Sequence, residues 1–462
     1  MVGGSGEGPA VKLIAQFSAP RIRSMRLSTT VAADEKCGLN MKNDVPTDEH
    51  ACVKCGTCNT VCPVFKVTGH EAHGARGKHH LKTHLQEADR SPLFADIFSK
   101  CLLCGACVEA CPRGLATPQM VIAGRGELPR LAGLSFIKYV SRKALIHPSL
   151  IAGLTRIGLA AKKLLFEHLP PASGLRLRLL SFDPDILQLP GKSYLDQVPD
   201  TDKEKGNDSG ADTGKQSINY FVGCFANHLQ PEIAEKTALL VSRIGKGKPV
   251  LPKDQTCCGM AALAAGKSDE ARALAKKNIE AYAENDLPIL TSCSSCYFQL
   301  MAYEELFADD PEWRQRARRF SARLMEFSSF FYENLAGGLE LIPTKESAPE
   351  QKVFYHDPCH LRFQLKITRE PRKLLQQFKG VTLQELPGGP QCCGQGGLFQ
   401  AAHPDLALQV RDRLLTDFGR LPADTVVTGC SGCLLQWQLG LAAKHNKIQA
   451  EHLAVFIAKR LQ

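Results

Sequence analysis

The sequence lacks several features that would decide its class. It has no run of about 18 apolar residues, so we expect no helix that crosses a membrane. No apolar stretch near the start is long enough for a secretory signal peptide. It also has no GxGxxG after a strand, and its two Gly-Lys-Ser triplets, at 191–193 and 266–268, lack the earlier glycine of a P-loop. We therefore expect no FAD, NAD or ATP on this chain.

Cysteine is scarcer than in a secreted disulfide scaffold, because 19 cysteines in 462 residues are about 4 %. Most of them stand in CxxC spacings, which in a long chain indicate metal sites and a reducing compartment. The net charge of +10 is concentrated in one segment. Residues 113–178 contain eleven Lys/Arg against two acids, a balance that attracts an anionic lipid surface, an acidic partner or nucleic acid.

Two short runs, CVKCGTCNTVCP and CLLCGACVEACP, follow the spacing C-x2-C-x2-C-x3-C-P. In bacterial ferredoxins with this spacing, the fourth cysteine ligates the other cluster. Gly56 and Gly105 allow a tight turn beside the sulfurs. A zinc site would leave the final x3-C-P unexplained, so we predict two [4Fe–4S] cubanes. The predicted ligand sets are Cys52, Cys55, Cys58 and Cys111 for one cluster, and Cys101, Cys104, Cys107 and Cys62 for the other.

Five further cysteines occur twice in the order C…CCG…CxxC, which is an internal repeat. The sets are Cys224, Cys257, Cys258, Cys293 and Cys296, then Cys359, Cys392, Cys393, Cys430 and Cys433. Five thiolates exceed the four that a cubane or a structural zinc needs. We therefore expect one or two further [4Fe–4S] clusters, noncubane forms included, with zinc in one or both sites as the alternative.

Short β-rich runs end at these cysteines, at 218–224, 287–293, 352–359 and 424–430, with amphipathic helical stretches between them. The pattern predicts α/β domains with the cysteines at the carboxyl ends of the strands. We expect residues 313–335 to form a helix that joins the two halves. The fold class expected is multidomain: a helical 2[4Fe–4S] ferredoxin-type domain followed by a duplicated α/β cysteine-rich (CCG) pair. The expected boundaries are a flexible N-terminal tail 1–45, the ferredoxin domain 46–125, a basic helical segment 126–198, a linker 199–217, the first CCG domain 218–335 and the second 350–462.

The two repeats differ around their first cysteine. The first has the apolar context Phe-Val-Gly-Cys-Phe, whereas the second reads His356-Asp357-Pro358-Cys359-His360. Histidine is the side chain best suited to deliver protons near neutral pH. We therefore predict His356 and His360 as catalytic residues, and the alternative is that they only hydrogen-bond sulfur or cap the next helix.

Two ferredoxin runs followed by two C…CCG…CxxC repeats resemble a family of iron–sulfur proteins over residues 48–460. The family includes the iron–sulfur subunits of glycolate oxidase and of anaerobic glycerol-3-phosphate dehydrogenase, and the CCG-bearing catalytic subunit of heterodisulfide reductase. The resemblance implies an electron-transfer subunit beside a flavoprotein dehydrogenase of a 2-hydroxy acid (glycolate or lactate) or of glycerol 3-phosphate, passing electrons towards quinone or another acceptor.

The same resemblance leaves a second function open. In the heterodisulfide reductase branch, five cysteines hold a noncubane [4Fe–4S] cluster that cleaves a disulfide, and here both cysteine sets are complete. The partners expected are the flavoprotein subunit and a membrane surface or membrane quinone-reactive subunit, without nucleic acid. The expected location is the cytoplasm, with a peripheral place on the inner face of the cytoplasmic membrane left open.

Overall fold

The computed structural model describes residues 52–85, 91–127, 192–199, 218–336 and 350–461, all of which belong to one unit, Met41–Gln462. The expected tail 1–45 and linker 199–217 lie outside the described residues, apart from residue 199. So does the basic helical segment 126–198, except for residues 126, 127 and 192–198.

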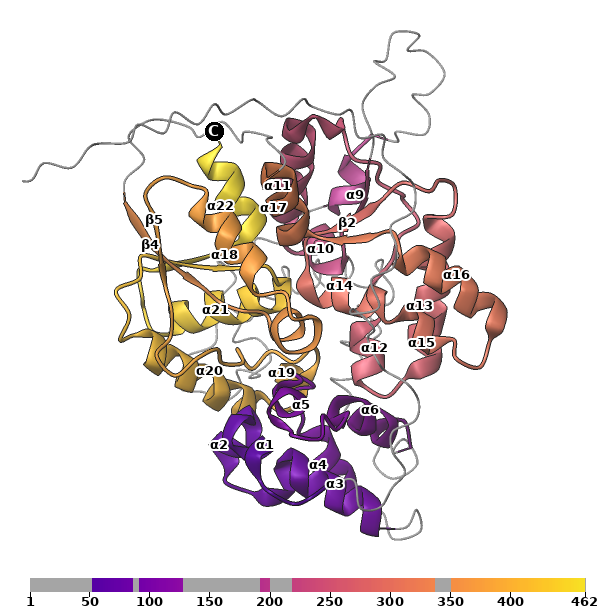
Figure 1. Cartoon of the computed structure of the whole chain (residues 1–462), viewed down its shortest axis with the longest axis vertical. Coiled ribbons are helices and arrows are strands. Elements are labelled where there is room, and N and C mark those ends of the chain that lie inside the picture. The colour runs from indigo at the N-terminus through magenta and orange to yellow at the C-terminus, as the bar shows by residue number, and fades with distance from the viewer. Residues whose placement is uncertain (1–51, 86–90, 128–191, 200–217, 337–349, 462) are drawn as a thin grey trace, which may run out of the picture. The chain divides into compact units, whose positions relative to one another are not determined.

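The first part, residues 52–127, is helical (Figure 1). Its elements are α1 (Thr57–Val61), α2 (Pro63–Thr68), η1 (Glu71–His73), α3 (Ala75–His84), α4 (Pro92–Ser99), α5 (Ala106–Ala110) and α6 (Thr117–Glu127). The two cysteine runs have the same backbone, because each uses two residues in the left-handed region before its short helix. These are Lys54 (φ 58°) and Gly56 (φ 81°) before α1, and Leu103 (φ 55°) and Gly105 (φ 81°) before α5. Glycine adopts this conformation without the steric cost that other residues incur.

The first repeat contains a parallel sheet in the order β1-β2-β3, formed by Asn219–Phe221, Ile289–Thr291 and Leu324–Glu326. Asn219 pairs with Ile289, which pairs with Leu324. A short helix, α9 (Tyr194–Gln197), packs against this repeat through Tyr194 and Leu195. The other helices are α10 (Cys224–His228), α11 (Pro231–Val241), η6 (Ser242–Lys246), α12 (Met260–Ala264), α13 (Ser268–Ala281), α14 (Ser294–Met301), α15 (Tyr303–Leu306), α16 (Pro311–Ser321) and α17 (Phe327–Ala336).

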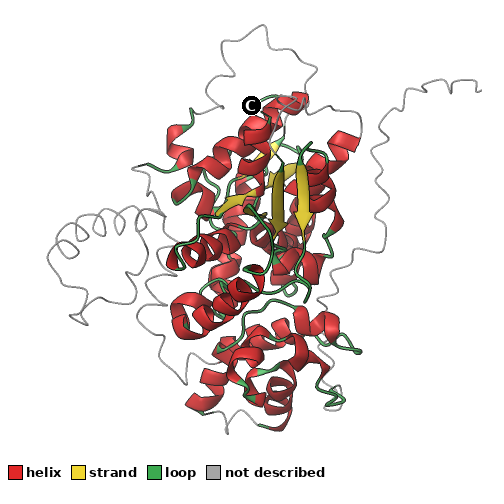
Figure 2. Cartoon of the chain, turned by 90° about the vertical axis from the view of Figure 1, so that its left-hand side faces the viewer, coloured by secondary structure: helices red, strands yellow, loops and turns green. Residues whose placement is uncertain are grey.

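The second repeat contains a parallel sheet in the order β5-β4-β6-β7, and Figure 2 shows the strands with helices beside them. The strands are β4 (Gln351–Tyr355), β5 (Val381–Gln384), β6 (Thr425–Thr428) and β7 (Gln449–His452). The helices are η7 (His360–Leu365), α18 (Arg369–Gln376), α19 (Phe399–Ala402), α20 (Pro404–Phe418), α21 (Ser431–Ala443) and α22 (Leu453–Arg460).

The strands expected at the four cysteine-terminated runs are present as β1, β2, β4 and β6. The single helix expected over 313–335 is wrong, because β3 divides it into α16 and α17. The division has a local cause: the Glu326 carboxylate accepts hydrogen bonds from the Ser328 hydroxyl (2.5 Å) and the Ser329 N–H (2.9 Å), which starts a new helix.

The two repeats share a core instead of having one each. A single cluster of buried side chains includes Phe221 and Leu300 from the first repeat and Phe354 and Trp437 from the second. Burial of this apolar surface fixes the two halves against each other, which places their strand ends side by side. Both sets of CCG cysteines lie at those ends.

Candidate metal centres

The thiols of the first predicted ligand set lie together. Cys52, Cys55, Cys58 and Cys111 line one small hollow, which Cys107 also reaches. The pKa of Cys58 is raised by burial and then by the nearby thiolates of Cys52, Cys111 and Cys55. Cys111 comes from the second run, so the structure brings the crossed fourth cysteine to the first set.

The second set gathers in the same crossed manner. Burial raises the pKa of Cys107 to about 12, and the charges of Cys101 and Cys62 raise it further. The backbone N–H of Phe65 points at the Cys62 sulfur at 3.5 Å, and that of Leu103 at the Cys101 sulfur at the same distance. Such donors are typical of protein sites that stabilise anionic sulfur.

Cys104 differs from the other ferredoxin cysteines because it faces the second repeat. It is buried, and its pKa is raised well above the usual value by burial and then by the charges of Cys392 and Cys359. The same hydrophobic cluster contains Cys104, with Cys62, Cys359 and Cys392 packed against it. The second ferredoxin site and the second repeat are therefore direct neighbours.

The two ferredoxin loops have different surroundings despite their common backbone. The second is covered: Gln364 donates a hydrogen bond to the Leu103 carbonyl at 3.3 Å, and a Cβ on Gly105 would lie 2.7 Å from the Gln364 side chain. The first loop is open, since Cys55 is exposed and Val53 is 58 % exposed. The first site therefore faces solvent and the second faces the rest of the chain.

A buried lysine lies beside the second ferredoxin site. Lys78 is 1 % exposed, and its ammonium donates to the backbone carbonyls of Ala72 and His73. Burial lowers its pKa, while the thiolates of Cys101 and Cys62 oppose that shift. Its positive charge therefore lies close to two predicted cluster ligands.

Arg125 is a second buried cation at the same site. Its guanidinium donates to the carbonyls of Phe98 (3.1 Å), Ser99 (3.0 Å), Cys101 (2.7 Å) and Ala264 (2.6 Å). Burial lowers its pKa, and the Cys101 charge opposes the shift. Because Ala264 ends α12, this one side chain also connects the ferredoxin part to the first repeat.

All ten CCG cysteines line one cavity of about 1190 Å³. In each repeat the first cysteine hydrogen-bonds the first of the adjacent pair, and the second of that pair hydrogen-bonds the last cysteine. These pairs are Cys224–Cys257 and Cys258–Cys296 in the first repeat, and Cys359–Cys392 and Cys393–Cys433 in the second. The remaining two cysteines, Cys293 and Cys430, hydrogen-bond each other across the repeats. The ten thiols thus form one connected array.

The glycine of each CCG triplet has a steric purpose. Gly259 (φ 87°) and Gly394 (φ 86°) both adopt the left-handed region directly before a turn. A Cβ on Gly394 would lie 2.7 Å from the Ala407 carbonyl oxygen, a distance that side chains do not reach without displacement of the backbone. The Gly394 N–H also points at the Cys392 sulfur at 3.5 Å. Only glycine lets the chain turn here while keeping both thiols in the cavity.

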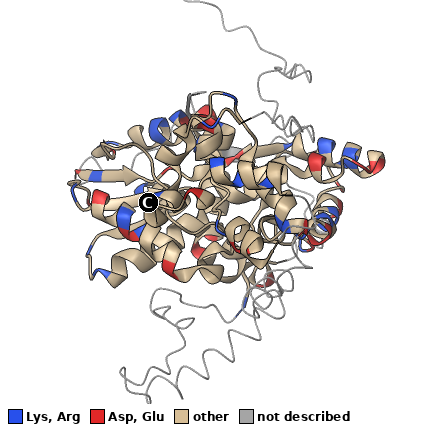
Figure 3. Ribbon diagram, turned by 90° about the horizontal axis from the view of Figure 1, so that it is seen from below, with Lys and Arg blue, Asp and Glu red and all other residues tan. Residues whose placement is uncertain are grey.

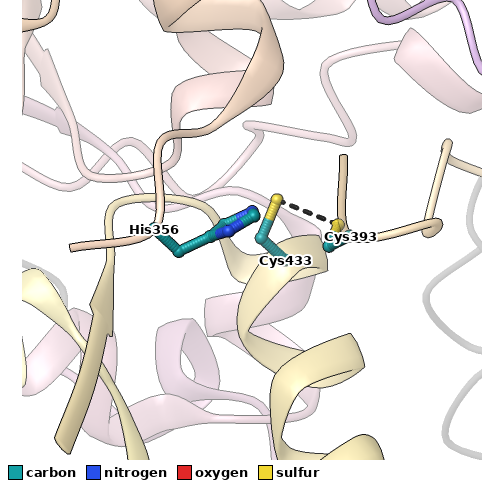
Figure 4. A group of neighbouring side chains, drawn as sticks. All are labelled: His356, Cys393 and Cys433. Atoms are coloured by element: carbon teal, nitrogen blue, oxygen red, sulfur yellow. Dashed lines mark hydrogen bonds between the residues drawn. The ribbon is translucent and has the colours of Figure 1, made fainter. Parts of the chain in front are cut away.

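The two predicted histidines both lie at the CCG thiols and both are buried. His356 has nitrogen atoms within 4.8 Å of the Cys393 and Cys433 sulfurs (Figure 4). His360 hydrogen-bonds the Ser295 hydroxyl at 3.1 Å and stacks on Phe298 at a ring distance of 4.7 Å. Burial lowers the pKa of each histidine to about 4, so the neutral rings predominate near pH 7. Their predicted role as proton donors remains a prediction.

Asp357, between them in sequence, is held in an ion pair. Arg372 donates two hydrogen bonds to its carboxylate, at 2.8 and 2.7 Å, and two more to Glu385 at 2.6 and 3.0 Å. This bidentate geometry is among the stronger protein interactions. It fixes the loop that presents Cys359 to the cavity.

Several residues of the site were not singled out from the sequence. Ser295 is one, although it stands inside a CxxC and bridges the repeats, with its hydroxyl 3.3 Å from the Cys430 sulfur. Its position between two ligands was a usable signal. Lys78, Arg125 and Arg372 gave no such signal, because their importance comes from burial against distant segments.

Comparison with known proteins places these centres in context. A model described as a cysteine-rich domain matches residues 218–301 and 353–438, and a model described as a 4Fe-4S dicluster domain matches residues 49–115. Lactate utilization protein A of Shouchella clausii is 30 % identical over 238 residues, which are 52 % of this chain and 97 % of that protein. This chain belongs to the family of lactate utilization protein A and the glycolate oxidase iron–sulfur subunit.

Two relatives in the family match over a longer stretch. The probable glycolate oxidase iron–sulfur subunit of Bacillus subtilis is 29 % identical over 419 residues, 87 % of this chain and 92 % of that protein. The glycolate oxidase iron–sulfur subunit of Escherichia coli is 25 % identical over 393 residues, 83 % and 88 % of the two chains. Like these family members, the chain is an iron–sulfur protein with a ferredoxin-type part and two CCG domains.

The residues present fit [4Fe–4S] binding. Thiols gather in groups, backbone N–H groups point at several sulfurs, and two buried cations face the second ferredoxin site. In the part of the chain that the structure describes, no helix is long and apolar enough to cross a membrane.

Proposed function

We propose that the chain is the electron-transfer subunit of a flavin-dependent dehydrogenase complex that oxidises a 2-hydroxy acid such as glycolate or lactate. Its partner is a flavoprotein subunit, and its electrons pass towards quinone or another acceptor. Glycerol 3-phosphate is the other substrate class that the family resemblance allows. The observation that carries the proposal is the order of the thiol sites, from exposed Cys55 through buried Cys104 to the CCG cavity.

We assign the ferredoxin ligands in crossed sets: Cys52, Cys55, Cys58 and Cys111, then Cys101, Cys104, Cys107 and Cys62. The proximity of Cys111 to Cys58, and of Cys62 to Cys107, supports this assignment. When bound, [4Fe–4S] clusters supply one-electron transfer.

The chain's own residues would set the direction of transfer. The first loop exposes Val53 and Cys55 to an electron donor, whereas Gln364 covers the second loop and excludes water from it. Cys104 lies beside Cys359 and Cys392, so the second CCG set is the next site reached. Its connection to the first set runs through the Cys293–Cys430 contact.

Reduction of a disulfide substrate is the second candidate function. It is favoured by one observation: two complete five-cysteine sets face a common cavity that has His360 in its wall. A substrate in that cavity could reach both centres. The relay requires no such shared space.

The ligand sets and the relay can be tested together with two single changes in anaerobically purified protein. Cys62→Ser should remove the electron paramagnetic resonance signal of the second ferredoxin cluster, and Cys111→Ser that of the first. With a small reduced flavoprotein such as flavodoxin as the electron donor, each variant should reduce the CCG centres at least tenfold more slowly than wild type in stopped-flow absorbance.

Wild-type rates in both variants would contradict the relay, and exchanged losses would contradict the crossed sets. The disulfide function has its own readout. Release of thiols from an added small disulfide, by reduced wild-type protein with no other acceptor, would favour it over the relay.

A further inference from the structure

The backbone at His356 is tied to the neighbouring strand. His356 directly follows β4, its N–H donates to the Val427 carbonyl at 2.9 Å, and its own carbonyl accepts a hydrogen bond from the Thr428 hydroxyl at 3.1 Å. Both partners belong to β6. The position of the imidazole is therefore set by the sheet and not by a loop.

The imidazole itself has an unusual environment. It is 2 % exposed, and its ring lies edge to face with Trp437 at a centroid distance of 5.5 Å and near Phe354 at 6.4 Å. No side-chain hydrogen bond joins it to another residue in the described part of the chain. Buried polar groups are almost always satisfied, so an exception of this kind calls for a partner.

Two thiols lie on the open side of the ring. The nitrogens of His356 and the sulfurs of Cys393 and Cys433 all lie within 4.8 Å of one another, and the two sulfurs are 3.3 Å apart (Figure 4). Neutral imidazole and thiolate are both common ligands of iron and zinc. The three side chains present their ligand atoms to one point.

The first repeat has no nitrogen at this place. Counting back the 135 residues that separate Cys359 from Cys224, the counterpart of His356 is Phe221, which is also fully buried. The counterparts of Cys393 and Cys433 are Cys258 and Cys296, whose thiols also hydrogen-bond each other. The thiol framework is repeated, and the imidazole is not.

We propose that His356 is a nitrogen ligand of the iron–sulfur centre held by the second repeat, beside Cys393 and Cys433. The proposal depends on the iron–sulfur chemistry of the family and holds for either proposed function. It makes the two CCG centres chemically unequal, because replacing thiolate by imidazole in an iron–sulfur site raises its reduction potential. The second centre would then retain an electron more readily than the first.

Pulsed electron paramagnetic resonance on the reduced protein tests this directly. The signal of the second centre is first identified as the one that Cys393→Ser removes. In wild-type protein this signal should show a nitrogen coupling that changes when the chain is made with ¹⁵N-histidine, and His356→Phe should abolish it. His360→Phe is the matched control, because it removes the other imidazole at the same cysteine and should leave the coupling unchanged.

A wild-type signal that ignores ¹⁵N-histidine would overturn the proposal, as would a coupling that survives His356→Phe. The labelled wild type decides the matter even if His356→Phe fails to assemble its centre. Loss of the coupling in His360→Phe alone would assign the ligand to the wrong histidine and equally refute the proposal.

Discussion

Lys78 and Arg125 bring two positive charges to the second ferredoxin site, and within the described residues neither has a carboxylate partner. Burying an ammonium without a counter-charge is costly. An anionic cluster held by Cys62, Cys101, Cys104 and Cys107 would supply that counter-charge. Because reduction makes a cluster more negative, nearby cations favour the reduced form, and this opposes the effect of burial.

Replacing Lys78 by Met should lower the reduction potential of the second ferredoxin cluster. A unit charge about 8 Å away at an effective dielectric constant of ~20 contributes roughly 2 kcal/mol, or about 90 mV for one electron. A redox titration followed by electron paramagnetic resonance measures the shift. Lys82→Met is the control, because Lys82 is in a partly exposed ion pair with Glu127 and should move the potential little. An unchanged potential in Lys78→Met would show that this charge does not act on the cluster.

The sequence was informative at the residue scale where chemistry needs a particular atom. Every predicted cysteine ligand lies in one of the thiol groups, and both predicted histidines lie beside the CCG thiols. Lys78 and Arg125 could not be found in this way. A lysine among polar residues has the same sequence appearance whether it is exposed or buried, and only the packed structure shows which.

Strands that end at a cysteine were predictable because a β-rich run leads straight to the ligand. The strands β3, β5 and β7 were not predicted, since they are three or four residues long and have no ligand at their end. Their pairing with β2, β4 and β6 comes from the sheet and leaves a weak local pattern. Glu326, which separates β3 from α17, therefore determines an element boundary through tertiary structure.

Glu326 should make the stability of the protein depend on pH. Burial raises its folded pKa, and the serine hydrogen bonds only partly oppose this. The folded state thus binds the proton more tightly than the unfolded state, so its contribution is complete below the unfolded pKa. That contribution is lost as pH rises through the folded pKa.

Glu326→Gln should remove this dependence, because the amide oxygen can still accept the helix-starting hydrogen bonds. We expect the variant to gain stability relative to wild type as pH increases from about 4.3, the usual glutamate value. Urea unfolding of both proteins at several pH values measures the difference. A constant difference across that range would exclude Glu326 as the titrating group.

At the scale of the whole molecule, the main departure from expectation is that the two CCG domains form one site. The sequence shows two sets of cysteines 135 residues apart and gives no indication that they share a cavity. That arrangement depends on the common core of Phe221, Phe354 and Trp437. Contacts between halves of a repeat are long-range and leave no periodic pattern to detect.

Charge is distributed differently in the described and undescribed parts of the chain. Basic and acidic residues are interspersed over the described ribbon (Figure 3), whereas residues 113–178 alone carry a net +9 in the sequence. Most of that segment lies outside the described residues. Its proposed contact with an anionic membrane face or an acidic partner stays a prediction.

Neutralising five of these residues should release the protein from anionic vesicles. Attraction to such a surface is about 1 kcal/mol per nearby Lys or Arg and weakens with salt. Wild-type protein should sediment with vesicles containing phosphatidylserine at moderate salt, and the variant with Gln at Lys138, Arg142, Lys143, Lys162 and Lys163 should not. Changing five exposed basic residues elsewhere, such as Lys54, Arg314, Arg318, Lys366 and Arg420, is the matched control. Equal binding of wild type and both variants would exclude this segment as the contact.

The unequal cover of the two ferredoxin loops has a consequence for survival in air. Oxidants attack sulfur according to its accessibility, and Cys55 is exposed whereas Cys104 is enclosed by the second repeat. A brief encounter with oxygen would therefore damage the outer centre while the inner ones persist. Protein aged in this way would keep most of its colour and iron, yet it would have lost the centre through which a donor reaches the rest.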